Sequence, residues 1–136
     1  MEAGAGNAGQ ARGAVPLTVT VRRTALGWTL GPVGELDHDT AGPFADALDA
    51  ALRTPRAVVV VDCAGLGFCD STGLNLLLQA RTRAVADSGE IVIARPTPMI
   101  ERMLEITGTG AVFRVVDTVE AAGVAEGPAP GGGDVP

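Results

Sequence analysis

Aromatic and metal-ligating side chains are scarce in this sequence. Its 136 residues include no tyrosine, one tryptophan and three phenylalanines, so its core must consist mainly of valine, leucine, isoleucine and alanine. One histidine and two cysteines, Cys63 and Cys69, do not make the ligand set of a zinc site. Both cysteines lie in an apolar stretch, which favours buried, reduced thiols. We therefore expect no bound metal and no cofactor.

Basic residues are also in the minority. Ten lysines and arginines face sixteen acidic residues, which gives a formal net charge of −6. This charge disfavours nucleic acid and anionic membranes as partners and suits a basic partner protein better. No segment approaches the ~20 apolar residues of a membrane span, and no early segment combines basic residues with an apolar stretch long enough for export. The sequence therefore predicts a cytoplasmic protein.

The composition is nevertheless that of a folded domain. Hydrophobic residues make up 46 % of the chain and charged residues 19 %, and the length fits one domain. Residues 1–14 and 126–136 are mixtures of Gly, Ala and Pro with almost no large apolar side chain, so we expect a disordered N-terminal segment and a disordered C-terminal tail. The folded domain is expected to span residues 15–125.

Hydrophobic periodicity predicts nine elements in this domain. Strands are expected at residues 17–23, 27–36, 56–66, 90–96 and 112–117, and helices within 37–55, at 71–88, at 97–108 and, as a short last helix, at 118–125. The first two strands should form a hairpin, whose second strand is made irregular or edge-like by Gly31-Pro32. Asp39 or Thr40 can cap the first helix, and Thr97 can cap the third.

This order, β-β-α-β-α-β-α-β-α, determines the fold class. Strand-helix-strand units require right-handed crossovers and give a mainly parallel sheet. We therefore expect an α/β fold: a small mixed, mainly parallel β-sheet with an opening hairpin and helices packed against it.

A polar cluster, Asp70-Ser71-Thr72, lies between an apolar strand and an apolar helix. Ser71 is placed as the N-cap of that helix, where a phosphate would meet backbone N–H groups and the positive end of the helix dipole. Gly73 in the first turn is expected to let a partner or a phosphate approach closely. Asn75, one turn after Ser71, is expected to face the same surface.

Several segments carry a resemblance to a known family. They are "GELDHDTA" (34–41), "VVVVDCAGLGFCDSTGLNLLL" (58–78), "EIVIA" (90–94) and "MIERMLEITG" (99–108). In this order the chain resembles an anti-sigma factor antagonist of the STAS-domain family, from about residue 17 to 125. The most specific piece is the run from Asp70 to Leu74, taken together with the segment at 34–41. Asn75 departs from the pattern, because a glycine is frequent there.

The resemblance implies a partner-switching function without enzymatic activity. The unphosphorylated protein would bind an anti-sigma factor that is also a serine kinase and so release a sigma factor. Phosphorylation by that kinase would switch the protein off, and a phosphatase would reset it. The implied phosphoacceptor is Ser71, and the implied partner-binding residues are Asp37, Asp70, Thr72, Gly73 and Asn75. The oligomeric state stays open between a monomer and a weak dimer.

Other interpretations of the cluster remain. Ser71 could be a simple helix cap, and Asp37 and Asp70 could be caps or solvated carboxylates. Alternatively, Ser71 or Thr72 could be phosphorylated in a STAS-type subunit of a different stress-signalling assembly.

Two enzymatic or ligand-binding alternatives are disfavoured. A hydrolase triad of Ser71, His38 and Asp37 would need an adjacent His and Asp to orient each other, and the sequence has no G-x-S-x-G elbow. A nucleotide site at the cluster would need basic residues, and the nearest one downstream is Arg81.

Overall fold

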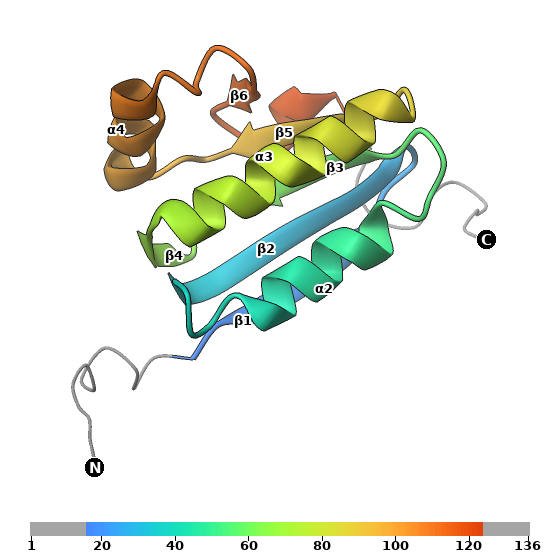
Figure 1. The fold of residues 1–136 in the computed structure, drawn as a ribbon. Helices are drawn as coiled ribbons and strands as arrows, with labels where there is room; N and C mark the ends of the chain where they lie inside the picture. Colours follow the sequence, from blue (N-terminus) through green and yellow to red (C-terminus); the bar gives the residue numbers. More distant parts are fainter. Residues whose placement is uncertain (1–15, 124–136) are drawn as a thin grey trace.

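The computed structural model describes residues 16–123, so the terminal segments predicted to be disordered lie outside the described residues. One sheet with helices against it makes up the described part (Figure 1). The elements are β1 (Thr18–Arg23), β2 (Gly27–Leu36), α2 (Gly42–Ala51), β3 (Val58–Asp62), β4 (Leu66–Cys69), α3 (Ser71–Ala86), β5 (Glu90–Ala94), α4 (Pro98–Thr107), β6 (Arg114–Val116) and the 3₁₀ helix η1 (Glu120–Ala122).

The sheet has six strands in the order β1-β2-β3-β5-β6, with β4 paired to β2. β1 runs antiparallel to β2, and every other pair is parallel. The hairpin and the parallel units arise as predicted, because β1 and β2 are joined by three residues, whereas β2 and β3, β4 and β5, and β5 and β6 are each joined through a helix that returns the chain to the start of the next strand. The predicted fold class is confirmed.

The two faces of the sheet are covered unequally. α2 and α3 lie side by side over one face (Figure 1) and bury most of the core there. The largest fully buried side chains of that core include Phe44, Leu30, Leu36, Ile91 and Ile93. On the other face a smaller cluster of Val60, Val92 and Ala94 packs under Ala122 of η1. Part of this second face therefore carries no helix.

The strand predicted at 56–66 is wrong in its extent. β3 ends at Asp62, a turn follows in which the N–H of Leu66 donates to the carbonyl of Cys63 (3.0 Å), and β4 then begins as a separate strand. Hydrophobicity could not show this break, because Cys63 and Leu66 are both buried and the apolar run continues through the turn. The structure thus adds one strand to the predicted order.

β2 is irregular, as one of the two alternatives from Gly31-Pro32 predicted, since its register shifts between Gly34 and Glu35, but it is not an edge strand. It has β1 on one side, and on the other side β3 and β4 one after the other. β2 pairs with β3 through Leu30 and with β4 from Gly34 onward. Pro32 lies in the interval between these two ladders, so its missing N–H interrupts neither of them.

The helix caps were predicted correctly for α4 but not for α2. Thr97 Oγ1 accepts the N–H of Ile100 (3.3 Å), and Gly108 ends α4 with a φ of +71°. α2 instead begins after Ala41 without a side-chain cap. Thr40, one of its predicted caps, donates its hydroxyl to the carbonyl of Glu35 (2.6 Å). The predicted last helix is reduced to η1.

Candidate functional site

The candidate site lies where two neighbouring parallel strands end. Leu36 is the last residue of β2 and pairs with Cys69, the last residue of β4. An aspartate follows each strand, and the N–H of Asp70 donates to the carbonyl of Leu36 (3.2 Å). The sheet therefore brings Asp37 and Asp70, which are 33 positions apart in the sequence, to the same edge.

Asp37 orders the turn that leads to α2. Its Oδ1 accepts the backbone N–H groups of Asp39 (2.9 Å) and Thr40 (3.1 Å). The hydroxyl of Thr40 accepts the N–H of Asp37 in return (2.9 Å). Reciprocal bonds of this kind are typical of an aspartate that caps a turn. Asp37 thus has a structural role here beside the role in partner binding that the resemblance implies.

Asp70, not Ser71, is the N-cap of α3. It has an extended backbone, and its Oδ1 accepts the N–H of Thr72 (2.9 Å). The prediction was wrong by one residue because aspartate and serine are comparably strong N-caps and stand next to each other here. Ser71 is therefore the first helical residue, its side chain is exposed, and it makes no side-chain hydrogen bond within residues 16–123. Its hydroxyl is available for reaction because Asp70 does the capping.

The next residues of α3 divide between core and surface. Gly73 is buried, and a Cβ built on it would lie 2.5 Å from Cys69 Sγ and 2.7 Å from Leu36 Cδ2. Its lack of a side chain lets the first turn of α3 pack against the ends of β2 and β4, and the approach of a partner at Gly73 stays a prediction. Thr72 is half-buried, whereas Asn75 is exposed. Since residues four apart share a helix face, Asn75 lies on the same side as Ser71.

An apolar groove of about 360 Å³ adjoins the cluster through Phe68 and Cys69, the residues just before Asp70. α4 forms its other wall, where Ile106 is 70 % exposed. The remaining lining residues are Met99, Arg102, Met103 and Thr107. The cluster alone did not point to this groove. The signal was the stripe of apolar residues on α4, which is wider than its two buried residues, Ile100 and Leu104, require.

The two thiols are buried and unpaired by any disulfide, as predicted. Burial raises the pKa of Cys63 to about 12 and that of Cys69 to about 11, and the nearby Asp70 charge adds to the second shift. Since the thiolate is the reactive form of cysteine, neither side chain is a nucleophile near neutral pH. Cys69 acts at the site as a packing residue under Gly73.

The described residues form neither the hydrolase triad considered above nor a cluster of metal ligands. No hydrogen bond joins Ser71 to His38 in the described part of the chain, and Asp37 turns its Oδ1 to backbone N–H groups. Within residues 16–123 no three His, Cys, Asp or Glu side chains are grouped to hold a metal ion. No α-helix of the same residues is long and apolar enough to cross a lipid bilayer. The site is an acidic helix start beside an apolar groove.

Comparison with known proteins agrees with this fold. The family model described as "Mlab, STAS domain" matches residues 20–117. This chain belongs to the STAS-domain family.

Several similar proteins are named anti-sigma factor antagonists. The chain is 27 % identical over 78 residues to the "Anti-sigma F factor antagonist" of Lysinibacillus sphaericus, covering 57 % of this chain and 67 % of the relative. It superposes on an anti-sigma factor antagonist from Mycobacterium paratuberculosis with a TM-score of 0.71 and 23 % identity, covering 78 % of this chain and 90 % of the other. The chain also superposes on the Bacillus cell fate determinant SpoIIAA in its phosphorylated form with a TM-score of 0.63 and 21 % identity, covering 77 % of this chain and 96 % of the other.

Proposed function

We propose that this protein is an anti-sigma factor antagonist that acts in the cytoplasm. Its unphosphorylated form binds an anti-sigma factor that is also a serine kinase and so releases a sigma factor. Phosphorylation of Ser71 ends this binding, and a phosphatase restores it. The names of the relatives support the partner class. The observation that carries the proposal is the exposed Ser71 hydroxyl, directly after the capping Asp70 at the start of α3.

The start of α3 can accept a phosphate without unfolding. A phosphoserine carries roughly −1.5 to −2 charges near neutral pH. At the first helical residue this charge meets the positive end of the helix dipole and backbone N–H groups that have no helical partner. The exposed Ser71 side chain also has room for it, since nothing packs over it in the described residues. We therefore expect the fold to be the same in both states.

The partner has no such compensation. Its contact surface in this proposal comprises Ser71, Thr72 and Asn75 together with the adjoining groove of Phe68 and α4. Asp37 and Asp70 already make the edge of this surface acidic, so an added dianion increases the local negative charge. Burying it against an apolar surface without a new cation costs several kcal/mol, enough to lower affinity by orders of magnitude. The switch therefore works by charge and bulk.

The test uses the cognate anti-sigma factor kinase and the full chain. After incubation with ATP, mass spectrometry should locate the phosphate on Ser71, and Ser71→Ala should abolish the modification. Isothermal titration should show Ser71→Ala binding as tightly as the unmodified protein and Ser71→Asp binding much more weakly. Thr82→Ala, at an exposed hydroxyl about three turns further along α3, is the matched control and should change neither result.

Three outcomes would contradict the proposal. Phosphate found mainly on a distant hydroxyl would reject Ser71 as the acceptor. Equal affinity of the two phosphorylation states, or amide shifts spread over β3 and β5 on phosphorylation, would reject exclusion by charge. Phosphorylation of Ser71 without binding to any anti-sigma factor would instead indicate a STAS-type subunit of a different signalling assembly.

A further inference from the structure

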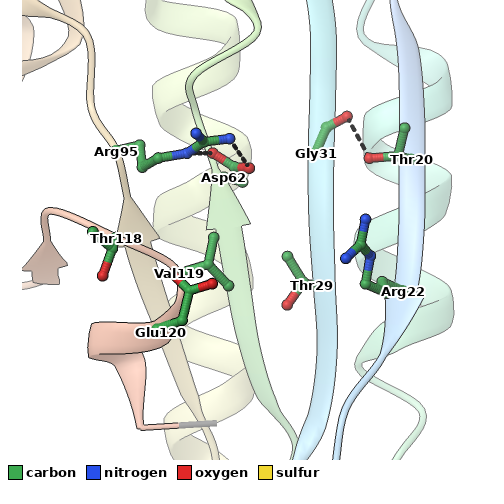
Figure 2. Close-up of a pocket in the computed structure, with 9 residues that line it drawn as sticks. All are labelled: Thr20, Arg22, Thr29, Gly31, Asp62, Arg95, Thr118, Val119 and Glu120. Carbon is green, nitrogen blue, oxygen red and sulfur yellow. Dashed lines mark hydrogen bonds and ion pairs between the residues drawn. The ribbon is translucent and has the colours of Figure 1, made fainter. Parts of the chain in front are cut away.

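Two hollows in the surface differ in how their charges are paired. The polar pocket has a volume of about 290 Å³ and lies on the sheet face that faces away from α2 and α3 (Figure 2). Its place follows from the register, because Thr29 of β2 pairs with Val60 of β3, which belongs to the small cluster under η1. The charged side chains that line the polar pocket are Arg22, Asp62, Arg95 and Glu120.

The charges of the polar pocket compensate one another. Arg95 donates through Nε and one terminal nitrogen to the two oxygens of Asp62, at 2.9 and 2.8 Å (Figure 2). Burial alone would raise the pKa of Asp62, but the hydrogen bonds from Arg95 and from the N–H of Ala64, with the charges of Arg95 and Arg22, hold it below the usual value. The charge of Glu120 in turn acts on Arg95. The described side chains of this pocket therefore leave no unpaired charge for a ligand.

The apolar groove beside Ser71 is different. Of the side chains that line its volume of about 360 Å³, the one charged group is Arg102 of α4. Arg102 is exposed, and its guanidinium makes no hydrogen bond or ion pair within residues 16–123. Thr107 also lines the groove, but its hydroxyl is satisfied because it donates to the carbonyl of Met103 (2.7 Å). The groove therefore presents apolar side chains and one unpaired cation.

The apolar part of the groove is suited to contact with another protein. Ile106 is 70 % exposed, the largest value among the exposed large hydrophobic side chains of residues 16–123. Met99 and Met103 are half-buried beside it, and methionine side chains adapt to the shape of a partner. Single exposed apolar residues are ordinary, whereas a groove of them next to a proposed contact surface favours docking.

Covering this groove would withdraw Arg102 from water. A cation that loses its water without gaining an anion opposes binding, whereas a carboxylate of the partner would replace the lost hydrogen bonds through a two-point contact. A lysine or arginine of the partner at the same place would be repelled. The groove therefore favours a partner segment that carries a carboxylate beside its apolar side chains.

We propose that the groove binds a segment of the anti-sigma factor in which an aspartate or glutamate flanks one or two large apolar side chains. The carboxylate pairs with Arg102, and the apolar side chains cover Ile106 and occupy the space between Phe68 and α4. This inference rests on the proposed function, because it names the part of the partner that contacts the surface beside Ser71. Arg102 makes the contact selective among anti-sigma factors, since those with a cation at this place are rejected.

The test measures the affinity of the cognate anti-sigma factor for the full, unphosphorylated chain and its variants by isothermal titration. Arg102 and Ile106 are exposed, so substitutions there should leave the fold intact. Arg102→Gln should weaken binding by ~10-fold or more, and Arg102→Glu should weaken it further. Ile106→Ala should weaken binding by about 10-fold. Arg53→Glu, at an exposed arginine after the end of α2, is the matched control and should bind like the unmodified chain.

A second measurement identifies the carboxylate. Each aspartate and glutamate of the anti-sigma factor is changed to lysine in turn, and the affinity of every variant for the unmodified chain and for Arg102→Glu is compared. One lysine variant should bind Arg102→Glu at least ~10-fold more tightly than it binds the unmodified chain, because the exchange restores a pair of opposite charges.

The outcomes separate this inference from the proposed function. Unchanged binding of both Arg102 variants, or no lysine variant that prefers Arg102→Glu, would overturn the inference and leave the proposed function in place. Failure of the unmodified chain to bind the anti-sigma factor would overturn both. A dimer of the chain alone that Ile106→Ala dissociates would make a second copy the occupant of the groove and would also overturn the inference.

Discussion

Ser71 and Thr29 both present a hydroxyl, but in opposite surroundings. Ser71 begins α3 with an exposed side chain beside two aspartates. Thr29 lies in a strand on the other face of the sheet, 8 % exposed, among side chains of both charges. A kinase must reach its acceptor, so the proposed phosphorylation needs the first arrangement. The second arrangement keeps a hydroxyl out of reach of a kinase, because little of the side chain is exposed.

The two sites also differ in what supports them. Ser71 is supported by close packing, because Gly73 packs against Cys69 and Leu36. Asp70 caps the N-terminal end of α3. The pocket stands on an ion pair near solvent, between Asp62 and Arg95. Packing at van der Waals distance tolerates little change, whereas a solvent-screened pair contributes little to stability. Substitutions should therefore be more costly beneath Ser71 than around Thr29.

The largest effect is expected for Gly73→Ala. The added methyl group would lie 2.5 Å from Cys69 Sγ, so the start of α3 must shift, at a cost of about 1–3 kcal/mol in the free energy of unfolding. Urea denaturation measures this. Gly42→Ala in the first turn of α2 is the matched control, because nothing lies within 4 Å of its Cβ position. If the two variants are equally stable, the packing beneath Ser71 tolerates an added methyl group. That result would contradict the expectation that substitutions are more costly beneath Ser71 than around Thr29.

A smaller effect is expected for Asp70→Ala. Loss of the bond from Thr72 N–H to the capping carboxylate should cost about 1 kcal/mol, whereas Ser71→Ala should stay within about 0.5 kcal/mol. Thermal unfolding of both variants would check that Asp70, and not Ser71, caps α3. A larger loss for Ser71→Ala would show that the serine takes part in capping after all.

The smallest effect is expected for Asp62→Asn. The loss in the free energy of unfolding is small because the side chain of Arg95 is 52 % exposed and water screens its ion pair with Asp62. Since the pKa of Asp62 is lowered in the folded state, its stabilisation is present above the unfolded value near 3.8 and is lost as the pH falls through the folded value. The difference between variant and unmodified chain should therefore shrink in acid.

Much of the fold was predictable because its helices and strands have clean periodicities. The hairpin, the buried strands β3 and β5 and the capped helix α4 all follow from local sequence. β4 was missed because a buried turn separates it from β3 and does not interrupt the apolar run. Gly31-Pro32 correctly indicated that β2 is irregular, but the sequence did not show that the irregularity is a change of partner inside the sheet and not a position at its edge.

The site was predicted less completely, and for a different reason. Helical spacing placed Asn75 beside Ser71, whereas Asp37 was included only because the resemblance implied it. The structure brings Asp37 and Asp70 to one edge and exposes Ser71 and Asn75. The inward position of Gly73 depends on how the first turn of α3 docks, which no local pattern encodes. The polar pocket combines residues from five segments between Thr20 and Glu120. Nothing in the separate segments indicates that they meet.

The change of partner along β2 has a consequence for how this domain can evolve. The half of β2 before Pro32 pairs with β3. The half after it pairs with β4, which leads directly into the N-terminal end of α3. An insertion or deletion in the stretch between Leu30 and Gly34 would therefore change the position of the second half of β2. The pairing of the first half with β3 would stay in register. The proposed interaction surface could change for a new partner while the ladders of β3 and β5 keep their register and only the first pairs of β1 shift.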